Sequence, residues 1–247
     1  MKLKSLIIFF LTNLVMNSHA MINSEVSEHH PYYAYVEFAN AQGSGYGGGV
    51  LISFQHVLTC AANIQGFQNW RIGLGSNSRR LHRLFVAARA IAHPNYQMQN
   101  NLRIFDIGII FMNAPVEMAS NIAPIFISSF PMHNSTNTQG LMMGYAGETS
   151  SGSQGLDNLQ AAHVRILSDL ECAQAYPNSN NLELFCGGDR TRRSNFCLGD
   201  QGGPFTVSSR GTEYLVGIAS LPGCSNFAST YMPVISFREW IRSETGV

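Results

Sequence analysis

Short apolar runs recur along the whole chain, and glycine, asparagine, serine and proline separate them. Examples are "YYAYVEFA" at residues 32–39, "RLFVAARAIA" at 83–92 and "EYLVGIAS" at 213–220. Runs of this length that are rich in β-branched and aromatic residues, with turn residues on both sides, are typical of strands. The pattern therefore predicts many short strands joined by turns.

Helical periodicity is confined mainly to the end of the chain. Residues 234–244, "VISFREWIRSE", place Val234, Phe237, Trp240 and Ile241 on one apolar stripe. A second short helix is expected at 168–176, "SDLECAQAY". Since no repeat of fixed period is present, many strands with one terminal helix predict an all-β barrel or sandwich.

The first residues have the pattern of a secretory signal peptide. Lys2 and Lys4 precede an apolar run at residues 6–16, and small residues follow at Ser18 and Ala20. The run is too short and too interrupted for a bilayer-spanning helix of about 20 apolar residues, although an N-terminal anchor is the alternative. We expect a signal peptide at 1–20, a secreted, extracellular chain at 21–247, and a glycan on the sequon at Asn134.

Charge and cysteine content narrow the range of partners. The formal net charge is 0 and charged residues make up 12% of the chain, so we expect neither nucleic acid nor a membrane as a partner. The chain has 5 cysteines, and an odd number leaves at least one unpaired within the chain. Their spacing matches no zinc-binding pattern, and we expect no metal and no cofactor.

Six segments follow one another along the chain: "GGGVLISFQHVLTCAANIQG", "IAHPNYQMQNNLRIFDIGII", "LMMGYAG", "CLGDQGGPF", "GIASLPGC" and "YMPVISFREWI". Taken in this order, they resemble segments of trypsin- and chymotrypsin-like serine proteases, the S1 family, and in particular its small insect-type members. The resemblance covers nearly all of residues 21–247. It implies an all-β fold of two six-stranded antiparallel Greek-key β-barrels with a C-terminal helix. The first barrel is expected at about 30–120, the second at about 121–233 and the helix at about 234–244.

The resemblance assigns three positions to the family's catalytic triad, in which a serine attacks, a histidine transfers the proton and an aspartate orients the histidine. Asp106 fills the aspartate position. Ala62 stands at the histidine position, or Asn63 if one gap is allowed, and Gln201 stands at the serine position. The nearest histidine, His56, lies earlier on a strand and is expected to point elsewhere. Because base and nucleophile are both missing, we expect a chain that is not an enzyme.

The resemblance also assigns the cysteines. The family bridge beside the histidine is absent, because its two positions hold Gly47 and Asn63. Cys60 is then the odd cysteine; we expect a small buried thiol, and the alternative is a disulfide-linked dimer. The two bridges that the resemblance implies are Cys172–Cys186 and Cys197–Cys224.

By the same resemblance, Asn195 lies at the base of the specificity pocket, and a neutral residue there does not favour a basic substrate side chain. Ser220 is placed near a tryptophan position of the pocket strand and Leu221 near a glycine position, where a leucine would narrow the pocket. Ser229 is placed at a second glycine position. We therefore expect a partly filled binding groove.

The loop at 197–205 keeps the glycines that set its turn. The backbone N–H groups of Gly199 and Gln201 are expected to form a nest for a carbonyl or carboxylate. Asp200 is expected to anchor the loop, as in family members where it pairs with a new chain terminus. No basic residue lies between Ala20 and Ile22, so we see no activation site, and Asp200 is expected to lack that ammonium or to pair with something else.

These observations favour a secreted serine protease homologue that works by binding an extracellular protein or peptide, such as an active protease or the substrate of one. Roles that the family suggests include regulating proteases in extracellular cascades or in reproductive secretions. Two alternatives remain open. One is a hydrolase that uses another nucleophile, such as Cys60 or a relocated Ser–His pair, and the other is a structural or ligand-carrying β-barrel.

Overall fold

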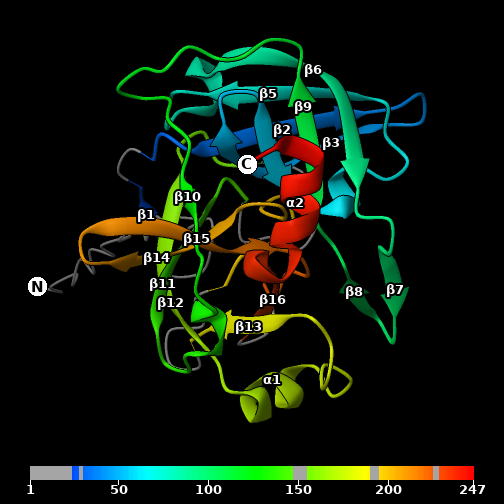
Figure 1. Ribbon diagram of the computed structural model, residues 1–247, viewed down its shortest axis with the longest axis vertical. Helices are drawn as coiled ribbons and strands as arrows, with labels where there is room; N and C mark the ends of the chain where they lie inside the picture. The colour runs from blue at the N-terminus through cyan, green and yellow to red at the C-terminus, as the bar shows by residue number, and fades with distance from the viewer. Residues whose placement is uncertain (1–23, 28–29, 147–154, 190–194, 225–227) are drawn as a thin grey trace, which may run out of the picture.

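The computed structural model describes residues 24–27, 30–146, 155–189, 195–224 and 228–247. The predicted signal peptide at 1–20 lies outside the described residues. The strands form two barrels that pack against each other, and the C-terminal helix lies against them (Figure 1). No helix in the described ranges has the length and apolar character needed to cross a membrane.

The first barrel closes in the order β2-β3-β4-β9-β6-β5, and all its neighbouring strands are antiparallel. Its strands are β2 (Tyr33–Ala39), β3 (Ser44–Ser53), β4 (His56–Thr59), β5 (Asn69–Leu74), β6 (Arg83–Ala92) and β9 (Gly108–Met112). A small hairpin of β7 (Gln97–Gln99) and β8 (Leu102–Ile104) precedes β9. Three-residue 3₁₀ turns η1 (Ala61–Asn63) and η2 (Arg79–Leu81) lie between its strands.

The second barrel closes through the pairs β12-β11-β14-β15-β16-β13 and back to β12. Its strands are β11 (Gln139–Gly144), β12 (Gln160–Ile166), β13 (Phe185–Gly188), β14 (Pro204–Ser209), β15 (Thr212–Ala219) and β16 (Ala228–Pro233). Two short strands lie outside this ring: β1 (Glu25–Val26) pairs with β12, and β10 (Phe126–Ile127) runs parallel to β15. Two six-stranded antiparallel barrels confirm the predicted fold class.

Both predicted helical segments are present. Helix α1 (Asp169–Ala175) begins at a capping box in which Ser168 and Glu171 bond each other's backbone N–H groups. The terminal segment is a 3₁₀ turn η4 (Val234–Phe237) continued by α2 (Arg238–Thr245), which ends at Gly246 in the left-handed conformation. A further 3₁₀ turn, η3 (Met132–Asn134), carries the exposed sequon asparagine.

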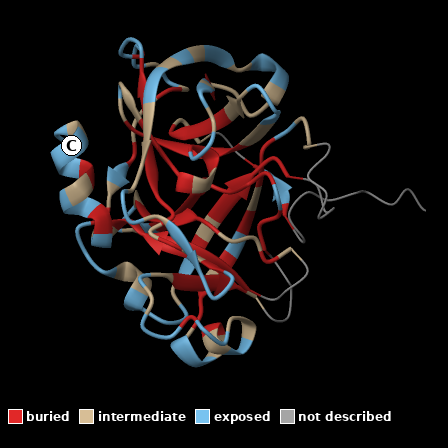
Figure 2. Cartoon of the chain, turned by 90° about the vertical axis from the view of Figure 1, so that its right-hand side faces the viewer, coloured by how far each residue is buried: buried red, intermediate tan, exposed pale blue. Residues whose placement is uncertain are grey.

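Buried residues, red in Figure 2, lie along the strands of both barrels and at the junction between them. Ile72, Leu74 and Ile110 belong to the core of the first barrel, and Phe205 and Tyr231 to that of the second. A third cluster joins strands of both barrels to α2. Side chains of these cores occupy the barrel interiors, which does not favour a role as a ligand-carrying barrel.

Candidate functional site

The three positions expected to form a triad meet where the barrels join. Ala62 lies in η1 after β4, Asp106 lies two residues before the start of β9, and Gln201 lies in the loop before β14. The Ala62 N–H donates to Asp106 Oδ1 at 2.8 Å. Ala62 and Gln201 line one hollow of about 780 Å³, which extends over the first barrel.

Asp106 is fully buried, and its carboxylate is held by neighbours other than a histidine. Oδ2 accepts a hydrogen bond from Ser220 Oγ at 2.6 Å, and Arg103 Nη1 lies 3.8 Å from the same oxygen. Burial raises the pKa of this carboxyl, while Ser220, Arg103 and the backbone of Ala62 act in the opposite direction. The guanidinium of Arg103 is therefore the cationic group beside Asp106.

Arg103 was not among the predicted site residues. It lies three residues before Asp106 in "LRIFD", and it also donates to the Ser220 carbonyl at 2.9 Å. In the sequence, only the three-residue spacing links Arg103 to Asp106. Phe105, which lies between them, turns the chain with φ of 53°. Ser220, expected near a tryptophan position of the pocket strand, directs its hydroxyl at Asp106.

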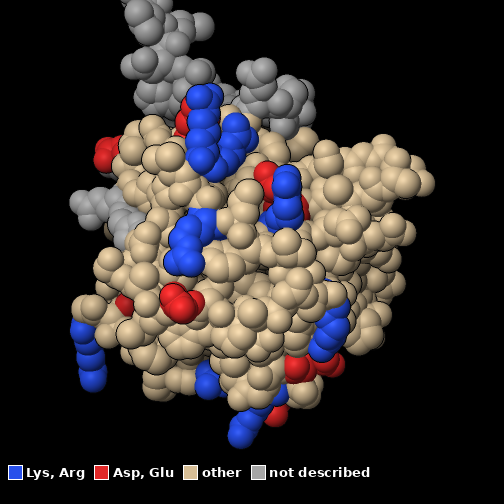
Figure 3. Space-filling view, turned by 90° about the horizontal axis from the view of Figure 1, so that it is seen from above, with Lys and Arg blue, Asp and Glu red and all other residues tan. Residues whose placement is uncertain are grey.

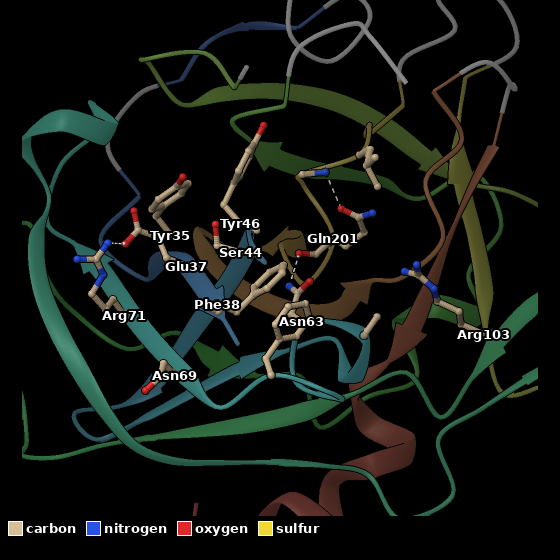
Figure 4. Close-up of a pocket in the computed structure, with 16 residues that line it drawn as sticks. Tyr35, Glu37, Phe38, Ser44, Tyr46, Asn63, Asn69, Arg71, Arg103 and Gln201 are labelled. Carbon is tan, nitrogen blue, oxygen red and sulfur yellow. Dashed lines mark hydrogen bonds and ion pairs between the residues drawn. The ribbon is translucent and has the colours of Figure 1, made fainter. Parts of the chain in front are cut away.

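Gln201 is buried, and its side chain folds back onto its own loop. Oε1 accepts a hydrogen bond from the Gly199 N–H at 2.6 Å (Figure 4). Gly199 adopts φ of 108°, a conformation that favours glycine, and a Cβ there would lie 2.7 Å from the Tyr46 ring. The predicted nest consists of the N–H groups of Gly199 and Gln201. The Gly199 N–H is already hydrogen-bonded within the chain.

Asn63 and Gly47, the two positions of the missing bridge, are in contact. Asn63 Nδ2 donates to the Gln201 carbonyl at 2.9 Å and to Thr59 Oγ1 at 3.0 Å. A Cβ on Gly47 would lie 2.4 Å from Asn63 Nδ2, so the amide occupies the space that a side chain at position 47 would need. The Gly48 N–H also donates to the Gln201 carbonyl, at 2.8 Å. Polar contacts thus tie η1 and β3 to the Gln201 loop.

Asn195, expected at the base of the specificity pocket, bonds Ser229, expected at a pocket glycine position. Asn195 and Ser229 are both fully buried, and Ser229 Oγ donates to Asn195 Oδ1 at 3.1 Å. The Gly223 N–H donates to Ser229 Oγ at 3.0 Å. Leu221 is half-buried and does not line the hollow, and neither does Asn195. Gly199, Gln201, Asn195 and Leu221 were predicted to form the binding surface. Of these, only Gly199 and Gln201 line the hollow.

Asp200 anchors the loop through backbone bonds. Its oxygens accept the Ala146 N–H at 2.7 Å and the Cys197 N–H at 3.0 Å, and a Cβ at Gly144 would collide with the carboxylate. Burial raises the pKa of Asp200 to about 6, against the lowering effect of these N–H groups. Within the described part of the chain, no cationic side chain forms an ion pair with Asp200; the new chain terminus considered above lies outside it.

The disulfide prediction is confirmed. Cys172 pairs with Cys186 and Cys197 pairs with Cys224, while Cys60 is free and fully buried. Burial raises the pKa of the Cys60 thiol, and the neighbouring Asp106 raises it further. An intermolecular disulfide needs an accessible sulfur, so the buried position does not favour a dimer through Cys60. The described residues contain no cluster of three His, Cys, Asp or Glu that could hold a metal.

The hollow itself is lined by aromatic rings and a few polar groups. Phe38 and Phe67 pack with ring centroids 4.4 Å apart, and Tyr35 stacks on Tyr46 at 5.7 Å. Glu37 and Arg71 form an ion pair of 2.7 Å at one side, as Figure 4 shows. A concave, mostly apolar surface with a few oriented polar groups is typical of a ligand site.

Comparisons with known proteins show which family has a chain similar to this one. The trypsin family model matches residues 22–241. Trypsin of Xenopus laevis is 29% identical over 203 residues, with 79% of each chain covered. Serine protease 1 of Rattus norvegicus is 31% identical over 202 residues, covering 79% of this chain and 78% of the relative. A solved structure of HL collagenase has a TM-score of 0.80 and 26% identity, and the match covers 92% of this chain and 99% of that one.

The matched region contains every position discussed above: η1, the Asp106 turn, the Gln201 loop and both disulfides. These matches do not assign the chain to a subgroup of the family, so the insect-type likeness stays a prediction. Together with the two closed barrels, they establish that the chain belongs to the trypsin-like S1 family of serine proteases.

Proposed function

We propose that this chain is a secreted, non-catalytic serine protease homologue that acts by binding an extracellular protein or peptide. The observation that carries the proposal is the Gln201 carboxamide, whose oxygen holds the Gly199 N–H at 2.6 Å. A carboxamide is not a nucleophile, and an N–H that is already bonded is not free to stabilise an oxyanion. The loop thus satisfies internally a donor that catalysis would need.

The base position supports the same proposal. Ala62 offers only a methyl group, and Asp106 is held by Ser220, the Ala62 N–H and the nearby Arg103. A guanidinium stays protonated and accepts no proton, so Arg103 does not replace a general base. Acid–base groups and nucleophile act as a unit in this chemistry, and the loss of both removes the acyl-enzyme route.

The binding half of the proposal rests on the hollow. Its aromatic lining and the Glu37–Arg71 pair suit a peptide or a protein loop, and the family scaffold is built to hold such segments. An active protease or the substrate of one is the partner that the scaffold favours. The signal-peptide pattern, the two disulfides and the exposed sequon at Asn134 support an extracellular location.

The first test asks whether the purified protein, without residues 1–20, reacts as a serine hydrolase. It is incubated with a fluorophosphonate probe and, separately, with a broad peptide library, and trypsin serves as the positive control. We expect no covalent labelling and no peptide turnover. Labelling or turnover above the heat-denatured sample would overturn the proposal.

A sharper variant restores the triad. We expect Ala62→His combined with Gln201→Ser to have no useful activity, because Asn195, expected at the pocket base, is still bonded to Ser229 and Arg103 still lies beside Asp106. Gln201→Ser alone is the matched control. Robust hydrolysis by the double variant would mean that the rest of the machinery is intact and would contradict this part of the proposal.

Binding in the hollow is tested with the same library at equilibrium. Phe67→Ala removes one of the two packed rings, and we expect it to weaken the peptides that the parent protein retains by about tenfold. Leu170→Ser, on α1 and outside the hollow, is the control. Equal retention by all three proteins would contradict binding at this surface.

A hydrolase site elsewhere is the second candidate, and one contact favours it. Ser53 Oγ lies 2.7 Å from His56 Nδ1. The Gln55 N–H also bonds Ser53 Oγ, at 3.2 Å, so the turn between β3 and β4 accounts for the pair. Burial and then Arg89 lower the pKa of His56. Fluorophosphonate labelling that disappears in Ser53→Ala would support this candidate.

A further inference from the structure

A second hollow, of about 1020 Å³, lies beside helix α1 of the second barrel, and we call it the α1 groove. Its walls are η3, the start of α1 and the segment at residues 179–186 that leads into β13. Figure 1 shows α1 at the end of the molecule opposite to the first barrel. The α1 groove shares no lining residue with the hollow over the first barrel, so it is a separate feature.

The sequon forms part of the groove wall. Asn134 and Thr136, its first and third residues, both line the α1 groove. The turn η3 fixes this position through its backbone, because the Asn134 N–H donates to the Pro131 carbonyl at 3.0 Å. Asn134 is exposed, as an acceptor of a glycan must be. A glycan on Asn134 therefore starts inside the groove.

The lining of the α1 groove suits a neutral ligand that is rich in hydroxyl groups. Polar members of the lining are Ser168, Asp169, Ser179, Asn180, Asn181 and Glu183. Amides, hydroxyls and carboxylates bond the donors and acceptors of a sugar. The described residues that line the groove include no Lys or Arg, whereas Figure 3 shows several such side chains, in blue, over the first barrel. Two acidic residues without a cation disfavour a phosphate or sulfate ligand.

The wall opposite the sequon is shaped by local bonds. Residues 176–184, all of them described, contain no helix or strand. The Ser179 N–H donates to the Tyr176 carbonyl at 2.9 Å, and the Leu182 N–H donates to the Ser179 carbonyl at 3.2 Å. The Leu184 N–H donates to the Leu182 carbonyl at 2.8 Å. Bonds between residues two or three apart shape this segment but do not link it to η3, and a ligand that spans the groove would do so.

We propose that an oligosaccharide on Asn134 lies in the α1 groove and bridges η3 to the segment at 179–184. It comes from a polyisoprenyl diphosphate donor: the bond from Asn134 Nδ2 to sugar C1 forms, the bond from C1 to the phosphate oxygen breaks, and Nδ2 loses one proton. Attachment holds the first sugars at a high effective concentration beside Asn180 and Glu183. The inference rests on the extracellular location in the proposed function and is independent of the loss of catalysis.

The first test measures how fast the glycan is removed from the native protein. The full chain is expressed in a mammalian secretory cell line, and protein from the medium is digested with peptide N-glycosidase. The control is Asn134→Gln combined with Arg210→Asn, which moves the sequon to residues 210–212 on the exposed turn between β14 and β15. Arg210 has φ of 51°, which asparagine tolerates. We expect the glycan on Asn134 to be released at least about tenfold more slowly than the relocated one. Equal release rates would overturn the inference.

Variants of the groove wall then locate the protection. Asn180→Ala with Glu183→Ala keeps the sequon, and we expect it to speed release from Asn134 by about tenfold. Asn113→Ala with Glu117→Ala is the matched control, because both residues are exposed and lie outside the groove. Circular dichroism checks that each variant is folded. A glycan that stays protected in the folded groove variant would contradict docking at this wall.

Hydrogen exchange gives a readout that does not depend on the groove variants. In Asn134→Gln, and in the variant with the relocated sequon, we expect the amides of residues 179–184 to exchange about tenfold faster than in the glycosylated parent. The amides of α2, which is outside the groove, should exchange at the same rate in all three proteins. Unchanged exchange at 179–184 would mean that the glycan extends into solvent.

Failure of this inference is distinguishable from failure of the proposed function. If mass spectrometry finds a glycan on the relocated sequon and none on Asn134, the inference fails and the extracellular location stands. If neither protein reaches the medium or carries a glycan, the extracellular location fails and the inference fails with it. If the fluorophosphonate probe labels a protein whose Asn134 glycan is protected, the docked glycan stands on an active enzyme.

Discussion

At the scale of single residues, Gln201 has the clearest effect on chemistry. Its side chain bonds the Gly199 N–H, and its backbone carbonyl accepts from Gly48 N and Asn63 Nδ2. One residue therefore blocks a donor on one side and ties the loop to the first barrel on the other. The side-chain bond can be removed without touching the backbone bonds, which makes the two roles separable.

Gln201→Ala should free the Gly199 N–H. We expect an unfolding free energy lower by about 1–3 kcal/mol, because a buried donor loses its partner. We also expect the Gly199 amide resonance to shift on titration with a small carboxylate such as N-acetylglycine, which the parent protein should not bind there. An unchanged Gly199 resonance in a folded variant would contradict the claim that Gln201 fills the nest.

At the scale of elements, β3 and η1 are joined without the family bridge. The Asn63 amide takes up the space next to Gly47 and reaches the Gln201 carbonyl, so the joint extends into the second barrel. Thr59 Oγ1 accepts from the same amide and donates to the Gly48 carbonyl at 2.8 Å. A hydrogen-bonded joint of this kind depends on the small residue at position 47.

Gly47→Ala tests this joint. Its Cβ would lie 2.4 Å from Asn63 Nδ2 and 2.7 Å from the Gln201 carbonyl, so we expect destabilisation by about 1–3 kcal/mol. Asn63→Ala alone should cost about 1–3 kcal/mol through its lost bonds. The double variant should be about 1 kcal/mol more stable than the sum of the two effects predicts, measured by urea unfolding. Strict additivity would mean that the two residues do not share this space.

At the scale of the whole molecule, the ordered motifs were enough to predict the fold and both disulfides. Strand alternation alone left barrel and sandwich open, and the order of the segments decided between them. Contacts between distant parts of the chain were not predictable in this way. Arg103 beside Asp106, the Gln201–Gly199 bond and the Asn195–Ser229 bond all depend on side-chain directions that spacing does not determine.

The pH dependence of stability is also a property of the whole molecule, and one buried group can be isolated from it. Burial raises the pKa of Asp200 to about 6, whereas an unfolded aspartate titrates near its ordinary value of about 3.9. Between these two values the folded state binds more protons than the unfolded state. The contribution of Asp200 to the unfolding free energy therefore falls as the pH rises from about 4 to about 6, by about 3 kcal/mol in total.

Other groups act in the opposite direction over nearby pH values. Burial lowers the pKa of His56, His82, His93 and His133, so each disfavours the folded state as the pH falls below the ordinary histidine pKa.

The comparison that isolates Asp200 is therefore the difference in unfolding free energy between the parent protein and Asp200→Asn, measured by urea unfolding from pH 4 to 7. Asparagine keeps the shape but leaves one of the two N–H groups poorly paired, so the variant should be less stable at pH 4. Because asparagine does not titrate, this deficit should shrink by about 3 kcal/mol by pH 7. A deficit that stays constant with pH would mean that a cationic group neutralises Asp200, as a new chain terminus does in activated family members.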